Sequence, residues 1–338
     1  TLEAQMESLS EAWGWSPEDH ILLALPLHHV HGLVNVLGTA LWNGARVSVL
    51  PSFEAEEVWE RLGRGDLTLF MGVPTQYARL LSAWQSASLF TRDAWSSGSR
   101  TCRLMVSGSS ALPTTTLGRW DEITGHYLLE RYGMTEIGMA LSNLLEGERV
   151  PGHVGYPLPG VEVRIVDPET GEEASEGRIQ VRGATLFDRY WARPKATADA
   201  FAPGDAAGDP PWFRTGDEAE IGDRGAFRIL GRSNADILKT GGYKVSALEI
   251  EEVLRTHPLI SEVAVVGLPD ETWGDQVAAA VELDREAAMR LGIIRAEALR
   301  LEGLRAWGKQ RMAPYKVPRA LPVSYTHLTL PTNRVAGG

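Results

Sequence analysis

Between residues 20 and 140, short apolar runs alternate with stretches of helical spacing, and this alternation restricts the possible folds more than any other feature of the sequence. The apolar runs predict buried strands at Ile21–Leu25, Arg46–Leu50, Thr68–Gly72 and Arg103–Ser107. Helical spacing follows them, as in the segment from Tyr77 to Trp84. Strands alternating with helices are typical of an α/β layer on a mostly parallel sheet, which we expect here.

The pattern changes near Pro151. Val161–Val166, Arg178–Val181 and Phe227–Leu230 are short alternating runs, separated by Gly, Pro and Asp residues. Such runs predict a smaller antiparallel β unit. Together with the α/β layers it makes a large N-terminal domain, which we expect to span residues 1–232.

A polar break at residues 233–236 predicts a hinge, and a second pattern begins after it. Ser246 and Glu249 have the spacing of a capping box that opens a helix, and Val263–Val266 reads as a strand. We therefore expect a small, mobile α+β domain over residues 237–322, so the whole chain is an α/β and α+β multidomain protein. Residues 323–338 show neither the helical nor the strand periodicity of apolar residues, which predicts a non-native tail.

Charge and composition exclude some functions. The net charge of −11 leaves no basic footprint, so we expect no nucleic acid and no anionic membrane as the main partner. No apolar run reaches the roughly 18 residues that span a bilayer. The single cysteine, Cys102, cannot form an intrachain disulfide, which suits a reducing compartment.

Four glycine-containing segments combine residue types that suit a nucleotide site. They are Val106–Ser110, Glu130–Glu136, Trp212–Asp217 and Lys239–Lys244. A Gly/Ser turn after a strand lets a flat ring approach the backbone, and a threonine hydroxyl can donate to a phosphate. A neighbouring glutamate can hold Mg²⁺, and an aspartate at a turn can accept both ribose hydroxyls. Each segment alone is more often a structural turn than a ligand site.

In this order and spacing the segments resemble the adenylate-forming superfamily of acyl-CoA synthetases, luciferases and peptide-synthetase adenylation domains. The resemblance covers roughly residues 1–319. Glu130–Glu136 matches the phosphate and magnesium signature, and Thr215–Asp217 with Arg232 matches the ribose site. Leu25–Gly32 matches the acyl-pocket motif.

The resemblance implies a role for each matching residue. Ser109 and Ser110 would line the adenine pocket, Tyr132 would pack on the purine, and Gly133 would belong to the same nucleotide site. The remaining roles are Thr135 on the α-phosphate, Glu136 on Mg²⁺, Asp217 and Arg232 on the ribose, His29 in the acyl pocket, and Gly241 and Gly242 in a loop for thioester formation. His28 and His31 are expected to be packing or hydrogen-bonding histidines.

Within the superfamily, several segments are similar to the malonyl-CoA synthetases, above all the mitochondrial ones of animals. The physical counterpart of that similarity is Arg131, because a guanidinium can clamp the second carboxylate of a dicarboxylic acid. The alternative is that Arg131 forms a structural ion pair with a nearby acid such as Glu130 or Asp121. The resemblance implies malonate, ATP and CoA as substrates, Mg²⁺ as a cofactor and the mitochondrial matrix as the location. No obligate protein partner is evident.

Two parts of the superfamily's machinery are expected to be missing from this sequence. A phosphate-binding loop would lie before Thr1, and the catalytic lysine would follow Lys316, after which no lysine occurs. An intact enzyme would form an acyl adenylate and then a CoA thioester, and we expect this chain to be impaired in that reaction. The alternatives are an inactive nucleotide-binding fragment and an adenylating enzyme that loads a carrier protein.

Overall fold

The computed structural model describes residues 1–222, 224–284, 287, 289, 299–321 and 323–324. Its contacts divide the chain into two compact units, Thr1–Ile229 and Leu230–Gly338, so the division falls inside strand β12 (Phe227–Arg232). We describe each unit by itself, and the hinge at residues 233–236 stays a prediction. Within the described residues, no helix is both long and apolar enough to cross a membrane.

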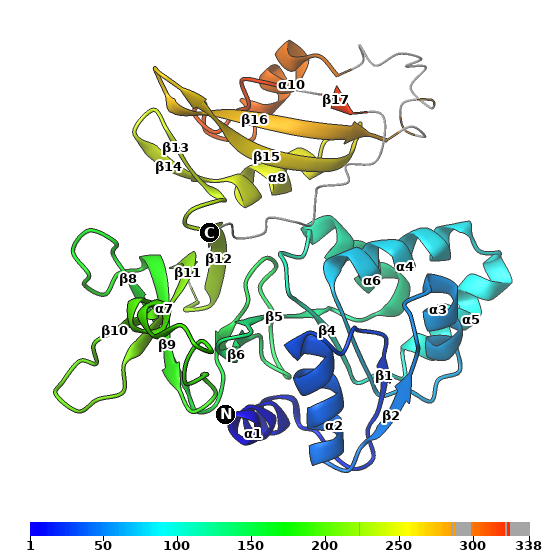
Figure 1. Cartoon of the computed structure of the whole chain (residues 1–338). Helices are drawn as coiled ribbons and strands as arrows, with labels where there is room; N and C mark the ends of the chain where they lie inside the picture. Colours follow the sequence, from blue (N-terminus) through cyan, green and yellow to red (C-terminus); the bar gives the residue numbers. More distant parts are fainter. Residues whose placement is uncertain (223, 285–286, 288, 290–298, 322, 325–338) are drawn as a thin grey trace. The chain divides into compact units, whose positions relative to one another are not determined.

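The first unit is built on a seven-stranded sheet, which confirms the predicted α/β layer (Figure 1). Its strands in spatial order are β2 (Arg46–Val49), β1 (His20–Leu23), β3 (Leu69–Gly72), β4 (Leu104–Ser107), β5 (Leu129–Met134), β6 (Gly138–Ser142) and β7 (Tyr156–Pro157). The first five are parallel to one another, and β6 and β7 continue the sheet in antiparallel pairing.

Apolar side chains alternate between the two faces of this sheet, so each face carries its own core. On β3, Leu69 and Met71 join one cluster while Phe70 joins the other. The helices that contribute buried side chains to the first cluster are α1 (Leu2–Trp13), the π-helix η1 (His31–Gly38) and α2 (Thr39–Trp42). Those that contribute to the second are α3 (Ala55–Gly63), α4 (Pro74–Ser86), α5 (Leu89–Ser99) and α6 (Thr114–Thr124).

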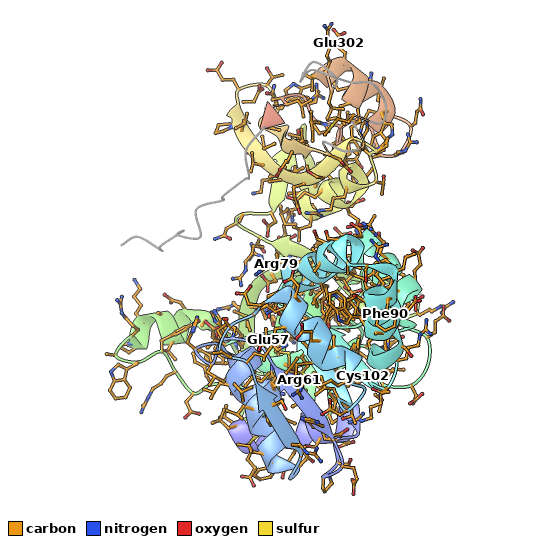
Figure 2. The ribbon with its side chains drawn as sticks, turned by 90° about the vertical axis from the view of Figure 1, so that its right-hand side faces the viewer. Glu57, Arg61, Arg79, Phe90, Cys102 and Glu302 are labelled. Carbon is orange, nitrogen blue, oxygen red and sulfur yellow. The ribbon has the colours of Figure 1, made fainter. Side chains whose placement is uncertain are left out.

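Figure 2 looks onto this second helical layer. Arg61, Arg79 and Phe90 lie on α3, α4 and α5, and the Phe90 ring is 84% exposed. Inside the layer, Trp59 stacks with Trp95 and Trp120 at ring distances of 5.7 and 5.2 Å. These three tryptophans therefore pack in the core of this layer.

The predicted antiparallel β unit is a second sheet in the same unit. Its strands are β10 (Phe201–Ala202), β11 (Trp212–Ile221), β9 (Glu176–Gly183) and β8 (Val161–Val166), with β12 paired to β11 and helix α7 (Pro194–Ala200) before β10. Buried side chains of this sheet, such as Ile179, Val181 and Phe213, belong to the same core cluster as Leu104 and Leu129. The two sheets therefore share one hydrophobic core.

The second unit is an α+β structure with its own core. Its elements are β13 (Ile237–Thr240), β14 (Tyr243–Ser246), α8 (Ala247–Arg255), β15 (Ile260–Asp270), β16 (Gly274–Leu283), α10 (Leu301–Gly308) and β17 (Val323–Ser324). The predicted capping residue is confirmed, because the Ser246 hydroxyl accepts the Glu249 N–H at 3.1 Å. The Glu249 carboxylate accepts from Lys316 Nζ at 2.6 Å, so the second bond of the predicted capping box is not described. The start of the predicted tail differs from expectation. Val323 pairs with Val281 of β16, and residues 325–338 lie outside the described residues.

Candidate active site

The carboxyl ends of β4 and β5 bring two predicted site residues together. Ser107 at the end of β4 is in register with Glu130, so Ser109 follows directly beside Arg131. A Cβ on Gly108 would lie 2.6 Å from the Arg131 Cζ, which is why a glycine is needed where the guanidinium meets the backbone. Ser109 itself has φ +76°, a strained conformation of the kind found at functional sites.

Arg131 is a buried cation with an incomplete set of partners. Its side chain donates from Nη2 to the Ser109 Oγ at 3.3 Å, while Nε is buried without a hydrogen bond. Burial lowers the pKa of Arg131 to about 9, so the guanidinium remains charged at neutral pH. In the part of the chain that the structure describes, Arg131 forms no ion pair with a carboxylate.

Among the residues that the structure describes, Arg131 does not form the ion pair that was its alternative role. Neighbouring side chains on a strand point to opposite faces of the sheet, so Glu130 lies on the other side of β5. Its Oε1 accepts the Gly152 N–H at 3.0 Å. A charge buried without a counter-ion is costly, and proteins keep such a charge mainly where it has a function.

His31 completes this group, and its place beside Arg131 was not predicted. It begins η1 and is 4% exposed, and its Nδ1 lies 3.3 Å from the Ser109 Oγ. The bond agrees with the expectation that His31 is a packing or hydrogen-bonding histidine. Burial lowers its pKa well below the usual value, and the charges of Arg131 and His29 act in the same direction. The sequence did indicate this position near Ser109 and Arg131. His31 follows β1, and the carboxyl ends of parallel strands share one edge of a sheet.

His29, the predicted acyl-pocket residue, is exposed next to this group. Its ring lies 4.3 Å from that of His28, and its electrostatic effect on His31 indicates that the two are close.

A hydrogen-bonded pair of side chains, Tyr132 and Asp217, joins the two sheets of the first unit. The Tyr132 hydroxyl donates to the Asp217 Oδ2 at 2.5 Å, and the Asp217 side chain is only 5% exposed. The register of β11 against β9 shifts between Arg214 and Glu218, and Gly216 in this irregular stretch has φ +78°. Phe213 and Ala219 on either side of this stretch are buried, as is Asp217 between them, so Asp217 lies on the core-facing side of β11.

The turn between β5 and β6 carries Thr135 and Glu136. It closes with a hydrogen bond from the Ile137 N–H to the Met134 carbonyl oxygen at 3.2 Å. A Cβ on Gly133 would lie 2.1 Å from the Gly138 carbonyl oxygen, so the close approach of the strands requires glycine there. Thr135 is exposed, as is Ser110 on the neighbouring loop, and Glu136 is half-buried.

The Glu136 side of the turn is held by the segment between β9 and α7. The Phe187 N–H donates to the Glu136 carbonyl oxygen at 2.8 Å, and the Tyr190 hydroxyl donates to Glu136 Oε1 at 3.0 Å. Burial raises the pKa of Tyr190 to about 12, and the hydrogen bond to Glu136 and its charge add to the shift. The phenol therefore remains a donor at neutral pH.

Gln5 of α1 holds the other side of the turn, and the sequence carried no sign of it. The Gln5 Oε1 accepts the Met139 N–H at 2.5 Å, although the two residues are 134 positions apart. Gln5 is 2% exposed. Only the folded chain brings α1 next to β6, so no local pattern could have indicated this contact.

The chemistry of the turn fits a magnesium ion bound together with a nucleotide. Mg²⁺ is commonly held by one or two carboxylates plus substrate phosphate oxygens. Glu136 is one such carboxylate, and Thr135 beside it offers a hydroxyl. No group of three or more potential metal ligands occurs among the residues that the structure describes, so a metal site built from protein alone is not found there.

The other predicted site residues belong to the second unit. Arg232 ends β12, is exposed, and its backbone N–H donates to Asp236 Oδ2 at 2.9 Å. Gly241 and Gly242 form the exposed turn between β13 and β14, with φ values of +57° and +84°. The Gly241 N–H donates to the Trp273 carbonyl oxygen at 2.8 Å.

Two family profiles match most of the chain. The profile described as AMP-binding enzyme matches residues 2–191, and that described as AMP-binding enzyme C-terminal domain matches residues 249–334. The chain is 46% identical to the mitochondrial malonate–CoA ligase ACSF3 of Xenopus laevis, over 95% of this chain and 57% of that protein.

Solved structures of similar sequence share the fold. The ATP-bound MatB of Rhodopseudomonas palustris superposes with a TM-score of 0.82 at 36% identity, covering 96% of this chain and 60% of that one. A malonyl-CoA ligase in a ternary product complex with methylmalonyl-CoA and AMP gives 0.62 at 37% identity, covering 96% and 66%. The chain thus spans less than two thirds of the length of these relatives.

Proposed function

The chain belongs to the AMP-binding enzyme family, and from that premise we propose that the protein activates a short dicarboxylic acid with ATP and transfers the acyl group to CoA. In the first step a carboxylate oxygen of the acid attacks the α-phosphate, and pyrophosphate leaves. In the second step the CoA sulfur attacks the acyl carbonyl, its proton is lost to solvent, and AMP leaves. Malonate is the proposed acid, with methylmalonate as a second one.

The observation that carries this proposal is the buried guanidinium of Arg131, which has no carboxylate partner among the described residues. A monocarboxylic acid gives such a group nothing to bind once its single carboxylate reacts. A dicarboxylic acid keeps a second carboxylate, which Arg131 can hold through charge-assisted hydrogen bonds. The neutral imidazole of His31 and the hydroxyl of Ser109 lie beside it and offer further polar contacts.

The nucleotide roles are proposed from the same family resemblance, and one contact of the first unit supports the role of Asp217. Asp217, fixed by the Tyr132 hydroxyl, would accept the ribose hydroxyls. Ser109, Ser110, Tyr132 and Gly133 would surround the adenine, and Arg232 would assist at the ribose. Thr135 would donate to the α-phosphate.

Glu136 is the residue that would hold magnesium. The ion would neutralise charge on the phosphates when bound with ATP. The protein's own part described so far is to hold the Glu136 backbone in place, through the main-chain hydrogen bond from the Phe187 N–H.

The second step is assigned to the Gly241–Gly242 turn, where CoA would pass the backbone closely because neither residue has a side chain. Rotation about residues 233–236 would bring this turn into position for thioester formation. A mitochondrial location, as in the name of the Xenopus laevis relative, belongs to the same proposal. Fractionation of cells that express the full-length protein tests the location.

The function is tested by comparing malonate with propionate in the full-length protein, with thioester formation followed by mass spectrometry. Arg131→Ala should lower kcat/KM for malonate by roughly 30- to 1000-fold, since a charge-assisted clamp worth about 2–4 kcal/mol is lost. Propionate has no second carboxylate, so its turnover should change far less.

Arg149→Ala is the matched control. Arg149 is another arginine that is shielded from solvent, although less than Arg131, and it donates to the carbonyl oxygens of Tyr127, Leu144 and Leu145. It should leave the ratio of malonate to propionate turnover unchanged. If Arg131→Ala reduces both acids by the same factor, the dicarboxylate assignment is wrong.

A further inference from the structure

The contact between Tyr190 and Glu136 has no role in the function proposed above, yet it is the side-chain contact that the structure describes for the Glu136 carboxylate. Tyr190 belongs to the segment between β9 and α7, and Glu136 to the turn between β5 and β6, 54 residues earlier in the chain. The phenol occupies Oε1 at 3.0 Å. Its hydroxyl therefore acts on one carboxylate oxygen and leaves the other for a ligand.

Tyr190 is anchored by contacts that do not involve its hydroxyl. Its ring packs edge-to-face on Phe187 at 4.8 Å, and its backbone N–H donates to the Thr197 Oγ1 at 3.0 Å. Phe187 in turn contacts Phe201 and Phe213 in the second sheet. The hydroxyl is therefore presented to Glu136 from a rigid base, and removing it would leave the packing of the ring intact.

We propose that Tyr190 is a positioning residue that fixes the carboxylate of Glu136 for a magnesium–nucleotide complex. A carboxylate can rotate about its last side-chain bond, and that freedom must be lost when it takes up a cation. A hydrogen bond to Oε1 removes part of the freedom beforehand and directs Oε2 toward the ligand. Partners of this kind commonly alter metal affinity by 10- to 100-fold when they are removed. The inference rests on the proposed function of Glu136.

The experiment measures ATP binding to the full-length protein by calorimetry, once with Mg²⁺ and once with EDTA. In the wild type, Mg²⁺ should strengthen ATP binding, and Glu136→Gln should abolish that gain. Tyr190→Phe should reduce the gain by about 10-fold while leaving the affinity measured in EDTA unchanged. Tyr156→Phe is the matched control, because the Tyr156 hydroxyl donates to the Arg224 carbonyl oxygen at 3.3 Å, away from the turn. It should behave as the wild type.

The outcomes separate the inference from the function on which it rests. If the wild type binds ATP equally well with Mg²⁺ and with EDTA, or if Glu136→Gln keeps the gain, the magnesium role of Glu136 is wrong. If Glu136→Gln loses the gain and Tyr190→Phe retains it in full, only the positioning role is overturned. A purely structural role for the hydroxyl predicts a lower thermal midpoint and equal losses in both buffers, which would also overturn it.

Discussion

The predicted site residues of the two units are held in opposite ways. In the first unit, Arg131 and Asp217 are 3% and 5% exposed, and their hydrogen bonds link segments 22 and 85 residues apart. In the second unit, Gly241 and Gly242 are exposed and form a local turn between two adjacent strands. One region places charged side chains by long-range packing, and the other shapes the backbone with residues that have no side chain.

This difference indicates how each region can fail. In the first unit a substitution removes a charge or hydroxyl that we propose to bind a ligand, and the large shared core keeps the fold. In the second unit a substitution adds atoms where the backbone needs glycine, so the local structure itself is strained. Loss of ligand affinity should therefore be the signature of the first region, and loss of local stability that of the second.

The largest effect on ATP affinity is expected for Asp217→Ala. The affinity for ATP should fall about 10- to 100-fold, because hydrogen bonds from hydroxyls to a charged acceptor are worth about 1.5–3 kcal/mol. Calorimetric titration of ATP measures the change, and the thermal midpoint should move little. Wild-type affinity in this variant would contradict the ribose assignment.

Tyr132→Phe is the control for that experiment. It keeps the aromatic ring and removes only the hydroxyl that donates to Asp217 Oδ2. Its effect on ATP affinity should be smaller than that of Asp217→Ala, because the carboxylate remains available to the ligand. An equal loss in both variants would mean that the Tyr132–Asp217 bond matters and a direct contact of Asp217 does not.

In the second unit, Gly241→Ala should destabilise the turn more than Gly242→Ala. Both positions have positive φ, which costs an alanine about 1–2 kcal/mol. A Cβ at Gly241 would also lie 2.9 Å from the Trp273 ring, which already packs against the Arg319 guanidinium at 3.6 Å from the ring centre. Overpacking of this kind adds about 1–3 kcal/mol. No atom lies within 4 Å of a Cβ at Gly242.

Hydrogen–deuterium exchange of β13 and β14 measures this difference. Exchange should be fastest in Gly241→Ala, intermediate in Gly242→Ala and slowest in the wild type. Binding of ATP by the first unit serves as the internal control. Equal exchange in the two variants would show that the Trp273 contact yields without cost.

Local features of the fold could be predicted from the sequence because they depend on neighbours along the chain. The strand Val161–Val166 has the predicted bounds, and α8 begins after the predicted capping residue Ser246. The predicted strand Ile21–Leu25 is β1 at His20–Leu23, a shift at the ends that periodicity cannot resolve. Alternation and capping act within a few residues, so sequence patterns report them well.

The contacts that assemble the site could not be predicted, because each one joins segments that are distant in sequence. His31 meets Ser109 across 78 residues, Tyr190 meets Glu136 across 54, and Gln5 meets Met139 across 134. Family motifs named several of these residues but not their partners. The absence of an ion pair at Arg131, within the described residues, likewise depends on which face of β5 each side chain occupies.

The smallest expected effect is on the pH dependence of the free energy of unfolding. It is obtained by comparing one histidine from each unit. Burial lowers the pKa of His31 well below the ordinary value of about 6.5, and it also lowers that of His257, which lies against Trp307. The unfolded chain then binds a proton at a higher pH than the folded chain does. The stability that these neutral histidines contribute is therefore fully present above about pH 7.5. It falls as the pH drops below about 6.5, by at most about 1.4 kcal/mol per pH unit for each proton.

His31→Gln should flatten this fall between pH 7.5 and 5.5 more than His257→Gln does, because His31 is 4% exposed and also faces the charge of Arg131. Urea unfolding at the two pH values measures the change for each variant. Other titrating groups are common to wild type and variants, so their contributions cancel in the differences. An unchanged slope in His31→Gln would mean that His31 takes up its proton at the same pH in the folded chain as in the unfolded chain, and so becomes charged in the folded protein below about pH 6.5. The burial beside Arg131 that sets the first unit apart would then be weaker than the contacts indicate, because an imidazolium and a guanidinium cannot share a dry site without a counter-ion.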